Sequence, residues 1–160
     1  METIPFLTKE DVAALDGILT DYLQKSVATL ALVIDRGGTV IAQCGEAGAL
    51  DTTILAALAA GSFAATGELA QRIGEEEFNT LYQQGKTRNV LMSTLDEHSI
   101  ILTVFGEATT IGLVRLYTTQ AVGQLAMLLK TLRQRDPFDI PLALPETEPS
   151  ETGKTDKIFG

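Results

Sequence analysis

Few side chains in this 160-residue chain could carry out chemistry. The sequence contains one cysteine, Cys44, and one histidine, His98. A zinc site usually takes three or four Cys, His or carboxylate ligands, so these two residues could form one only with carboxylates. A Cys44–His98 nucleophile and base pair is formally possible, but Cys44 ends an apolar run and His98 lies in a polar turn. We therefore expect a structural cysteine, a solvated histidine, no catalytic residues and no metal site.

Phosphate-binding motifs are also absent. The sequence contains no G-x-x-x-x-G-K-[ST] and no G-x-G-x-x-G after an apolar run. Its carboxylates are scattered over expected helix starts and turns, and Glu75–Glu77 is most simply a solvated helix end. These features predict a binding module with no cofactor and no active site of its own.

Composition limits the partners and the compartment. A single cysteine excludes a disulfide within the chain and fits a reducing compartment, so we expect a cytoplasmic protein. Residues 1–7 do not have the pattern of a signal peptide. The net charge is −9 and there is no basic patch, so nucleic acid and anionic membranes are poor partners. The acidity could attract a basic partner, although ordinary solubility explains it more simply.

The order of elements predicts an α+β fold. A capping box of Thr8 and Asp11 starts a helix over 8–25, and a hairpin follows, with strands at 30–35 and 39–44. After a helix over 51–73 we expect strands at 89–95, 99–105 and 112–118 and a helix over 119–134, with 77–84 as the start of a long third strand bent around Gly85. This gives the order α-β-β-α-β-β-β-α.

Strand composition indicates how the sheet is covered. The runs 30–35 and 99–105 are apolar at both parities, which is typical of strands with both faces buried. We therefore expect a five-stranded antiparallel sheet between helices. The 89–95 strand mixes Asn89, Ser93 and Thr94 with apolar residues, which predicts a sheet edge open to pairing with a second copy.

The helix over 51–73 is unusual because ten of the twelve residues from 56 to 67 are small. At about 100° per residue, its large side chains share one arc, which we expect to face the core: Leu50, Ile54, Leu55, Leu58, Leu69 and Ile73. The other arc is small and uncharged, which predicts a docking surface: Thr53, Ala57, Ala60, Ala64, Gly67 and Gln71. A helix sandwiched inside its own domain is the alternative. A membrane span is less favoured, because the uncharged run of 16 residues is shorter than the ~20 that cross a bilayer.

Beyond residue 135 the composition changes. Four of the five prolines lie at positions 137, 141, 145 and 149, followed by a stretch rich in Ser, Thr, Glu and Lys. We expect a domain at 1–135 and a flexible, acidic, Pro-rich tail at 136–160.

Three segments resemble the roadblock/LC7 family over about residues 8–135. They are ALVIDRGGTVIAQCG, the helix LDTTILAALAAGSFAATGELAQRIGEEEF, and YQQGKTRNVLMSTLDEHSIILTVFGEATTIGLVRLY. The similarity is greatest to the bacterial members that regulate a small Ras-like GTPase in cell polarity and gliding motility. It implies a roadblock/LC7 (profilin-like) three-layer fold around the five-stranded sheet.

The resemblance also implies partners and sites. Such proteins form dimers in which third strands pair and long helices lie side by side, and the helical face holds one GTPase and stimulates GTP hydrolysis without supplying an arginine. Carried over, the GTPase-binding residues are Thr53, Ala57, Ala60, Ala64, Gly67 and Gln71. The expected homodimer contacts are Ala56, Ala59 and Phe63 on the helix and Val90, Met92 and Thr94 on the 89–95 strand. The alternative is a dimeric scaffold without effect on a nucleotide cycle.

Overall fold

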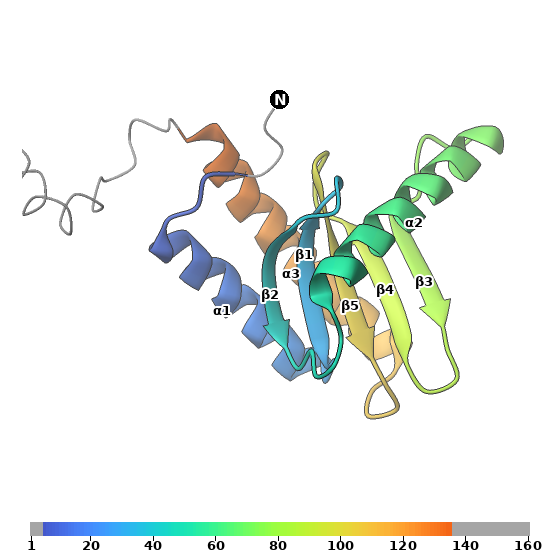
Figure 1. Ribbon diagram of the computed structural model, residues 1–160, viewed down its shortest axis with the longest axis horizontal. Coiled ribbons are helices and arrows are strands. Elements are labelled where there is room, and N and C mark those ends of the chain that lie inside the picture. The colour runs from blue at the N-terminus through green and yellow to red at the C-terminus, as the bar shows by residue number, and fades with distance from the viewer. Residues whose placement is uncertain (1–4, 136–160) are drawn as a thin grey trace, which may run out of the picture.

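Three layers make up the part of the chain that the computed structural model describes, residues 5–135 (Figure 1). The elements are α1 (Lys9–Ser26), β1 (Leu30–Asp35), β2 (Val40–Gly45), α2 (Thr52–Arg72), β3 (Thr80–Gln84), β4 (Asn89–Thr94), β5 (Ser99–Phe105) and α3 (Ile111–Gln134). The strands form one antiparallel sheet in the order β2-β1-β5-β4-β3. Helices α1 and α3 cover one face and α2 crosses the other. The α+β class and the order α-β-β-α-β-β-β-α are thus confirmed. The expected tail at 136–160 lies outside the described residues.

The first helix and the central strands follow the sequence closely. Thr8 caps α1: its hydroxyl accepts from the Asp11 amide, and the Asp11 carboxylate accepts from the Thr8 amide. All residues of β1 and β5 are buried, as their apolar character at both parities predicts. These two strands are neighbours at the centre of the sheet, where helices cover both faces.

The segment 112–118 is helical, so its prediction as a strand is wrong. The Thr110 hydroxyl accepts from the Leu113 amide and starts α3 there. The buried residues of α3 are Val114, Thr118, Ala121, Leu125, Leu129 and Leu132, which recur at intervals of three and four. This helical period continues unbroken through 119–134. The local β-forming composition of 112–118 is overridden by packing against α1 and the sheet.

The edge of the sheet also differs from the prediction. The segment 77–84 is not the beginning of a bent 89–95 strand, because β3 is a separate strand that pairs with β4 through a turn at Gly85. A Cβ at Gly85 would collide with the Arg88 carbonyl oxygen, so the turn requires a residue without a side chain. Strand β4 therefore lies between β5 and β3, and the edge strand on this side is β3.

Two polar contacts tie the helices together. In the first, the Tyr22 hydroxyl lies 2.8 Å from Thr103 Oγ1 and 2.6 Å from Thr118 Oγ1, and the Thr118 hydroxyl donates to the Val114 carbonyl. Because Thr118 gives its proton to that carbonyl, Tyr22 donates to Thr118 and accepts from Thr103. Burial raises the pKa of Tyr22.

The second contact joins the ends of α1 and α3. The Arg135 guanidinium binds both carboxylate oxygens of Asp11, at 3.2 and 2.6 Å, and also donates to the Phe6 carbonyl. This hydrogen bonding lowers the pKa of Asp11 to about 2. The end of the described chain is thereby fixed to the start of α1.

Candidate functional site: the exposed surfaces of α2 and the edge strand β3

The face of α2 that packs on the sheet is made of small residues and one phenylalanine. Its buried residues are Ala56, Ala59, Ala60, Phe63 and Ala70. All except Ala60 and Ala70 belong to one core cluster with side chains of β1, β4 and β5. The sheet supplies large residues here, Leu32, Ile34, Met92 and Leu102, so alanines fit the space that remains under the helix.

This packing corrects several site predictions. Ala56, Ala59 and Phe63, expected at a dimer contact, are buried within the chain at 0%, 6% and 6% exposure. Ala60, expected on the docking surface, is buried as well. Met92 is also in the core, and with Val90 and Thr94 it belongs to β4, an interior strand, so none of the three lies on a free sheet edge.

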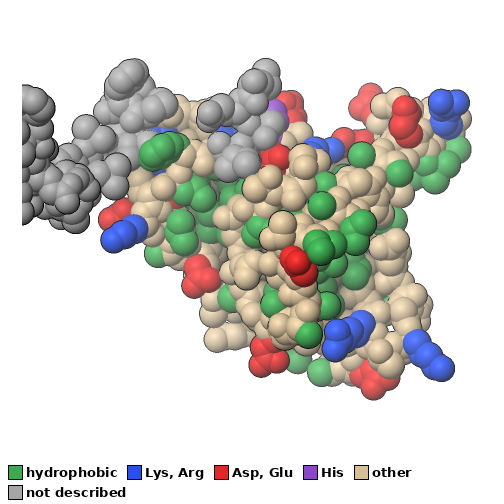
Figure 2. Space-filling view, in the orientation of Figure 1, with side chains coloured by type: hydrophobic (Ala, Val, Ile, Leu, Met, Phe, Trp, Pro, Cys, Tyr) green, Lys and Arg blue, Asp and Glu red, His purple; other side chains and the backbone are tan. Residues whose placement is uncertain are grey.

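Five of the six large residues of this arc face outward, so the expectation that the arc faces the core is wrong except for Leu55, which is half-buried and packs against the core. The exposed fractions are 38% for Leu50, 57% for Ile54, 67% for Leu58, 55% for Leu69 and 64% for Ile73. Figure 2 shows hydrophobic side chains gathered over α2 on this side of the molecule. Both arcs of the helix are apolar, and the volume left by the sheet determines which of them is buried.

We call this surface the outer face of α2: Leu50, Ile54, Leu58, Gly61, Ala65, Leu69 and Ile73. Gly61 would find nothing within 4 Å of an added Cβ. A glycine inside a helix lowers helix stability by ~1 kcal/mol relative to alanine, and packing within the described chain does not require a glycine at position 61. By length and composition α2 is also the one helix of the described residues that could cross a membrane, with a mean hydropathy of 1.4, but its other face packs on the sheet.

The flank of α2 next to the β1–β2 hairpin retains most of the predicted docking residues. Thr53, Ala57, Ala64 and Gln71 are exposed and Gly67 is half-buried. We call these five residues the small flank. The hairpin approaches closely here, since a Cβ at Gly38 would lie 3.1 Å from Cα of Ala57.

A cleft of about 350 Å³ lies beside the small flank. Its lining is Arg36, Phe63, Ala64, Gly67, Glu68, Gln71, Glu76, Glu77 and Phe78. The guanidinium of Arg36 lies over the Phe63 ring, 5.5 Å from its centroid, and donates to the Asp96 carbonyl at 3.1 Å. The cleft thus combines small residues of α2 with the three carboxylates of Glu68, Glu76 and Glu77. The sequence analysis did not predict carboxylates at the docking surface, because it interpreted Glu75–Glu77 as a solvated helix end.

The edge strand β3 is the second exposed feature, and the sequence analysis predicted a strand over 77–84 but not that it forms the edge of the sheet. It pairs with β4 on one side, and within residues 5–135 nothing pairs with its other side. Leu81 and Tyr82, shortly before the Gly85 turn, were the sequence features that indicate this strand.

The two residues considered for chemistry lie apart from these surfaces in the sequence order of elements: Cys44 is on β2 and His98 is in the β4–β5 turn. Within residues 5–135, no group of three His, Cys, Asp or Glu residues could hold a metal.

Comparison with known proteins shows similarity to one family over most of the described chain. The profile of the Roadblock/LC7 domain matches residues 16–105. The solved structure of Myxococcus xanthus MglB is 28% identical, with a TM-score of 0.75, over 81% of this chain and 98% of that chain. The gliding protein MglB of Thermus thermophilus is 30% identical, with a TM-score of 0.75, over 82% and 99%. An MglB with a tetrameric arrangement is 28% identical, with a TM-score of 0.78, over 82% and 99%.

Proposed function

The chain belongs to the Roadblock/LC7 domain family, and from this premise we propose that it is a homodimeric, MglB-like regulator that binds a small Ras-like GTPase and stimulates its GTP hydrolysis. The observation that carries the proposal is the pair of exposed surfaces on α2, the outer face and the small flank, in a fold shared with MglB structures.

The outer face of α2 and the edge of β3 support the dimer. Five large apolar side chains on or next to this helix are more than a third exposed, and contiguous apolar surface of this kind marks interaction sites in soluble proteins. Strand β3 offers unpaired backbone groups at the edge of the sheet. We propose that both are covered by a second copy, in an interface of the ~1,200–2,000 Å² class or larger. The tetrameric arrangement of a related MglB is consistent with self-association.

The small flank and the cleft beside it support the GTPase contact. Small side chains such as Ala57, Ala64 and Gly67 let another backbone approach closely, whereas they offer no charge to a transition state. We therefore propose that the protein positions the catalytic residues of the GTPase rather than supplying its own. The carboxylates of Glu68, Glu76 and Glu77 favour a basic segment of the partner at the cleft. A regulator of this type acts in the cytoplasm and has no active site.

The test combines the full-length protein with a purified small Ras-like GTPase from the same organism. Phosphate release is followed at increasing regulator concentration. We expect saturable stimulation, and we expect Ala64→Arg to weaken it by raising the concentration needed, because the arginine would project from the exposed small flank. Ala14→Arg on α1 is the matched control, since Ala14 is exposed on a helix across the sheet from α2. Binding without any change in phosphate release would instead support a scaffold and refute the regulatory proposal.

The proposed mechanism makes a separate demand on the arginines. Arg72 is exposed at the end of α2 and is the arginine most able to reach a bound nucleotide. An inserted arginine contributes ~10³–10⁵ in rate. Stimulation by positioning predicts that Arg72→Ala and Arg36→Ala each change the maximal rate only modestly. A loss of ~10³ or more at saturation in either variant would contradict the mechanism.

A further inference from the structure

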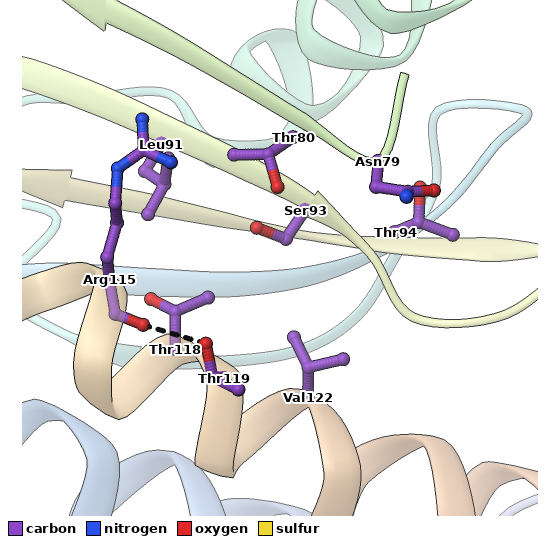
Figure 3. Close-up of a pocket in the computed structure, with 9 residues that line it drawn as sticks. All are labelled: Asn79, Thr80, Leu91, Ser93, Thr94, Arg115, Thr118, Thr119 and Val122. Carbon is purple, nitrogen blue, oxygen red and sulfur yellow. Dashed lines mark hydrogen bonds between the residues drawn. The ribbon is translucent and has the colours of Figure 1, made fainter. Parts of the chain in front are cut away.

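A cavity of about 390 Å³ lies between α3 and the β3–β4 part of the sheet, on the face opposite α2 (Figure 3). We call it the α3–β4 cavity. Its lining is Asn79, Thr80, Leu91, Ser93, Thr94, Arg115, Thr118, Thr119 and Val122. Volumes of ~300–1,000 Å³ are usual for small-molecule sites. The outer face and the small flank of α2 lie across the sheet from this cavity, whereas Thr80 belongs to β3, the strand whose free edge is assigned to the dimer.

The sheet presents hydroxyl groups to this cavity where a helix-covered face normally presents apolar side chains. Thr80 and Ser93 are paired across β3 and β4, and both project toward α3 in Figure 3. Their neighbours on the same face, such as Leu91 and Ile101, are apolar and fully buried. From the helix, Thr118 points toward the strands, and the Thr119 hydroxyl donates to the Arg115 carbonyl within α3. A space between two core elements is therefore lined largely by hydrogen-bonding groups.

Several of these groups have no partner in the folded chain. Ser93 is 7% exposed, yet its hydroxyl makes no hydrogen bond within residues 5–135. Among the described residues, Thr94 Oγ1 is fully buried without a partner, whereas Ser93 Oγ is not fully buried. By contrast, Thr103 and Thr118 are satisfied by Tyr22 in the adjacent core. A buried polar atom without a partner lowers the stability of a protein and is uncommon in native structures, so Thr94 Oγ1, beside the unpaired Ser93 hydroxyl, points to a ligand that hydrogen-bonds at this cavity.

The guanidinium of Arg115, which has N–H donors unpaired within residues 5–135, lies at one end of the cavity. Arg115 extends from α3 toward the strands, and its guanidinium lies over the Tyr82 ring, 6.0 Å from the centroid. Within the described residues no carboxylate lies at ion-pair distance from this guanidinium, and it makes no hydrogen bond. A guanidinium held over a ring presents its edge to a carboxylate or a phosphate, to which it binds through two parallel hydrogen bonds. Asn79, at the other end, adds an amide.

We propose that the α3–β4 cavity binds a small organic molecule that carries an oxyanion, a carboxylate or a phosphate ester, next to hydroxyl groups. Arg115 holds the oxyanion. Ser93 and Thr80 on the strands and Asn79 at the far end exchange hydrogen bonds with the hydroxyl groups of the ligand. Such a ligand gives the Ser93 hydroxyl a hydrogen-bond partner and pairs the guanidinium in one binding event.

The test is a titration of the isotopically labelled full-length protein, followed by the amide NMR signals of the cavity. The probes are glycerol 3-phosphate, glycerate and, as a neutral control, glycerol. We expect saturable shifts at Ser93, Thr94 and Thr119 with at least one of the two anionic probes and none with glycerol. The comparison of the two anions tells whether phosphate or carboxylate is preferred. Absence of saturable shifts with both anions, or shifts centred elsewhere, would overturn the proposal.

Variants separate the roles of the charge and of the hydroxyl. Arg115→Gln should weaken the anionic probe ~10–100-fold, the usual effect of losing a charge-assisted pair. Lys130→Gln on the same helix is the matched control, because Lys130 is exposed and does not line the cavity. Equal weakening by both variants would mean that only the overall charge matters and would refute the site.

Ser93→Ala distinguishes a ligand group from a structural one. Because the Ser93 hydroxyl has no partner within residues 5–135, its removal should leave the melting temperature unchanged or higher while weakening the probe. A lower melting temperature with unchanged probe binding would show that the hydroxyl serves the fold, and would contradict the proposal.

Discussion

The two faces of α2 predict opposite outcomes for the same change. Ala56 is fully buried against the sheet, whereas Leu58, the next residue but one, is 67% exposed. Arginine in place of Ala56 would bring a large charged side chain between α2 and the strands. An unpaired buried charge costs ~3–5 kcal/mol or more, a large part of the ~5–15 kcal/mol that stabilises a typical domain. We expect the Ala56→Arg protein not to fold.

Leu58→Arg should instead act on assembly. Full burial of a leucine stabilises by ~1.5–3 kcal/mol, and two thirds of that is available at an interface, about 1–2 kcal/mol per copy. In a two-fold dimer each substitution counts twice, so the free energy of dissociation should fall by ~2–4 kcal/mol and the dissociation constant should rise ~30–1,000-fold. The folded monomer should keep its stability to within ~0.5 kcal/mol.

Sedimentation velocity over a dilution series, together with circular dichroism melting, measures both effects. The wild type should sediment as a dimer and Leu58→Arg should shift toward the 17.1 kDa monomer with an unchanged helical spectrum. Ala65→Arg, on the same outer face and also exposed, should behave alike. If Leu58→Arg aggregates or unfolds while Ala56→Arg stays folded, the orientation of α2 described above is incorrect. If Leu58→Arg leaves a wild-type dimer intact, the outer face is not the interface.

Three further changes test the remaining features. Tyr22→Phe removes the hydroxyl that bonds both Thr103 and Thr118, and should lower the free energy of unfolding in urea by ~1–3 kcal/mol. Tyr117 is half-buried and its hydroxyl makes no hydrogen bond within the described residues, so Tyr117→Phe should change that free energy little. Because the pKa of Asp11 is lowered from 3.8 to about 2, its contribution to stability is present above about pH 4 and is lost as the pH falls toward 2. Asp11→Asn should therefore lower the melting temperature at neutral pH and reduce the fall in melting temperature between about pH 4 and pH 2. An unchanged fall would contradict the role of Asp11 in acid stability. Amide hydrogens of β3 that point away from β4 should exchange more slowly at high protein concentration than at low, and exchange that does not depend on concentration would exclude β3 from the dimer.

The sequence predicted those parts of the fold whose signals are local or redundant. The Thr8–Asp11 capping box determines the start of α1, and apolar residues at both parities identify β1 and β5 as central. The segment 112–118 was misassigned because a run this short can satisfy a strand pattern by chance. The wider spacing from Val114 to Leu132 shows the helix.

The exposed surfaces could be predicted only in part because they depend on volume and pairing. The sequence of α2 does not show how much space the sheet leaves beneath the helix. The sequence alone therefore could not determine whether the arc of leucines or the arc of alanines is buried. Strand β3 is short and contains Gln83 and Gln84, which gave it little apolar signal. Ser93, which suggested a sheet edge, instead lies on an interior strand and lines the cavity beneath α3.

The small residues of α2 therefore have two separate physical roles. On the inner face, Ala56 and Ala59 let the helix lie close to the large side chains of β1 and β5. A helix that uses its small side inward must turn its large side outward, so exposure of Ile54, Leu58 and Leu69 follows from the packing beneath them. A monomer would carry this apolar surface as a cost in solubility. The same arrangement that builds the core thus creates the surface that a second copy would cover, while Ala64 and Gln71 on the flank remain exposed for a different partner.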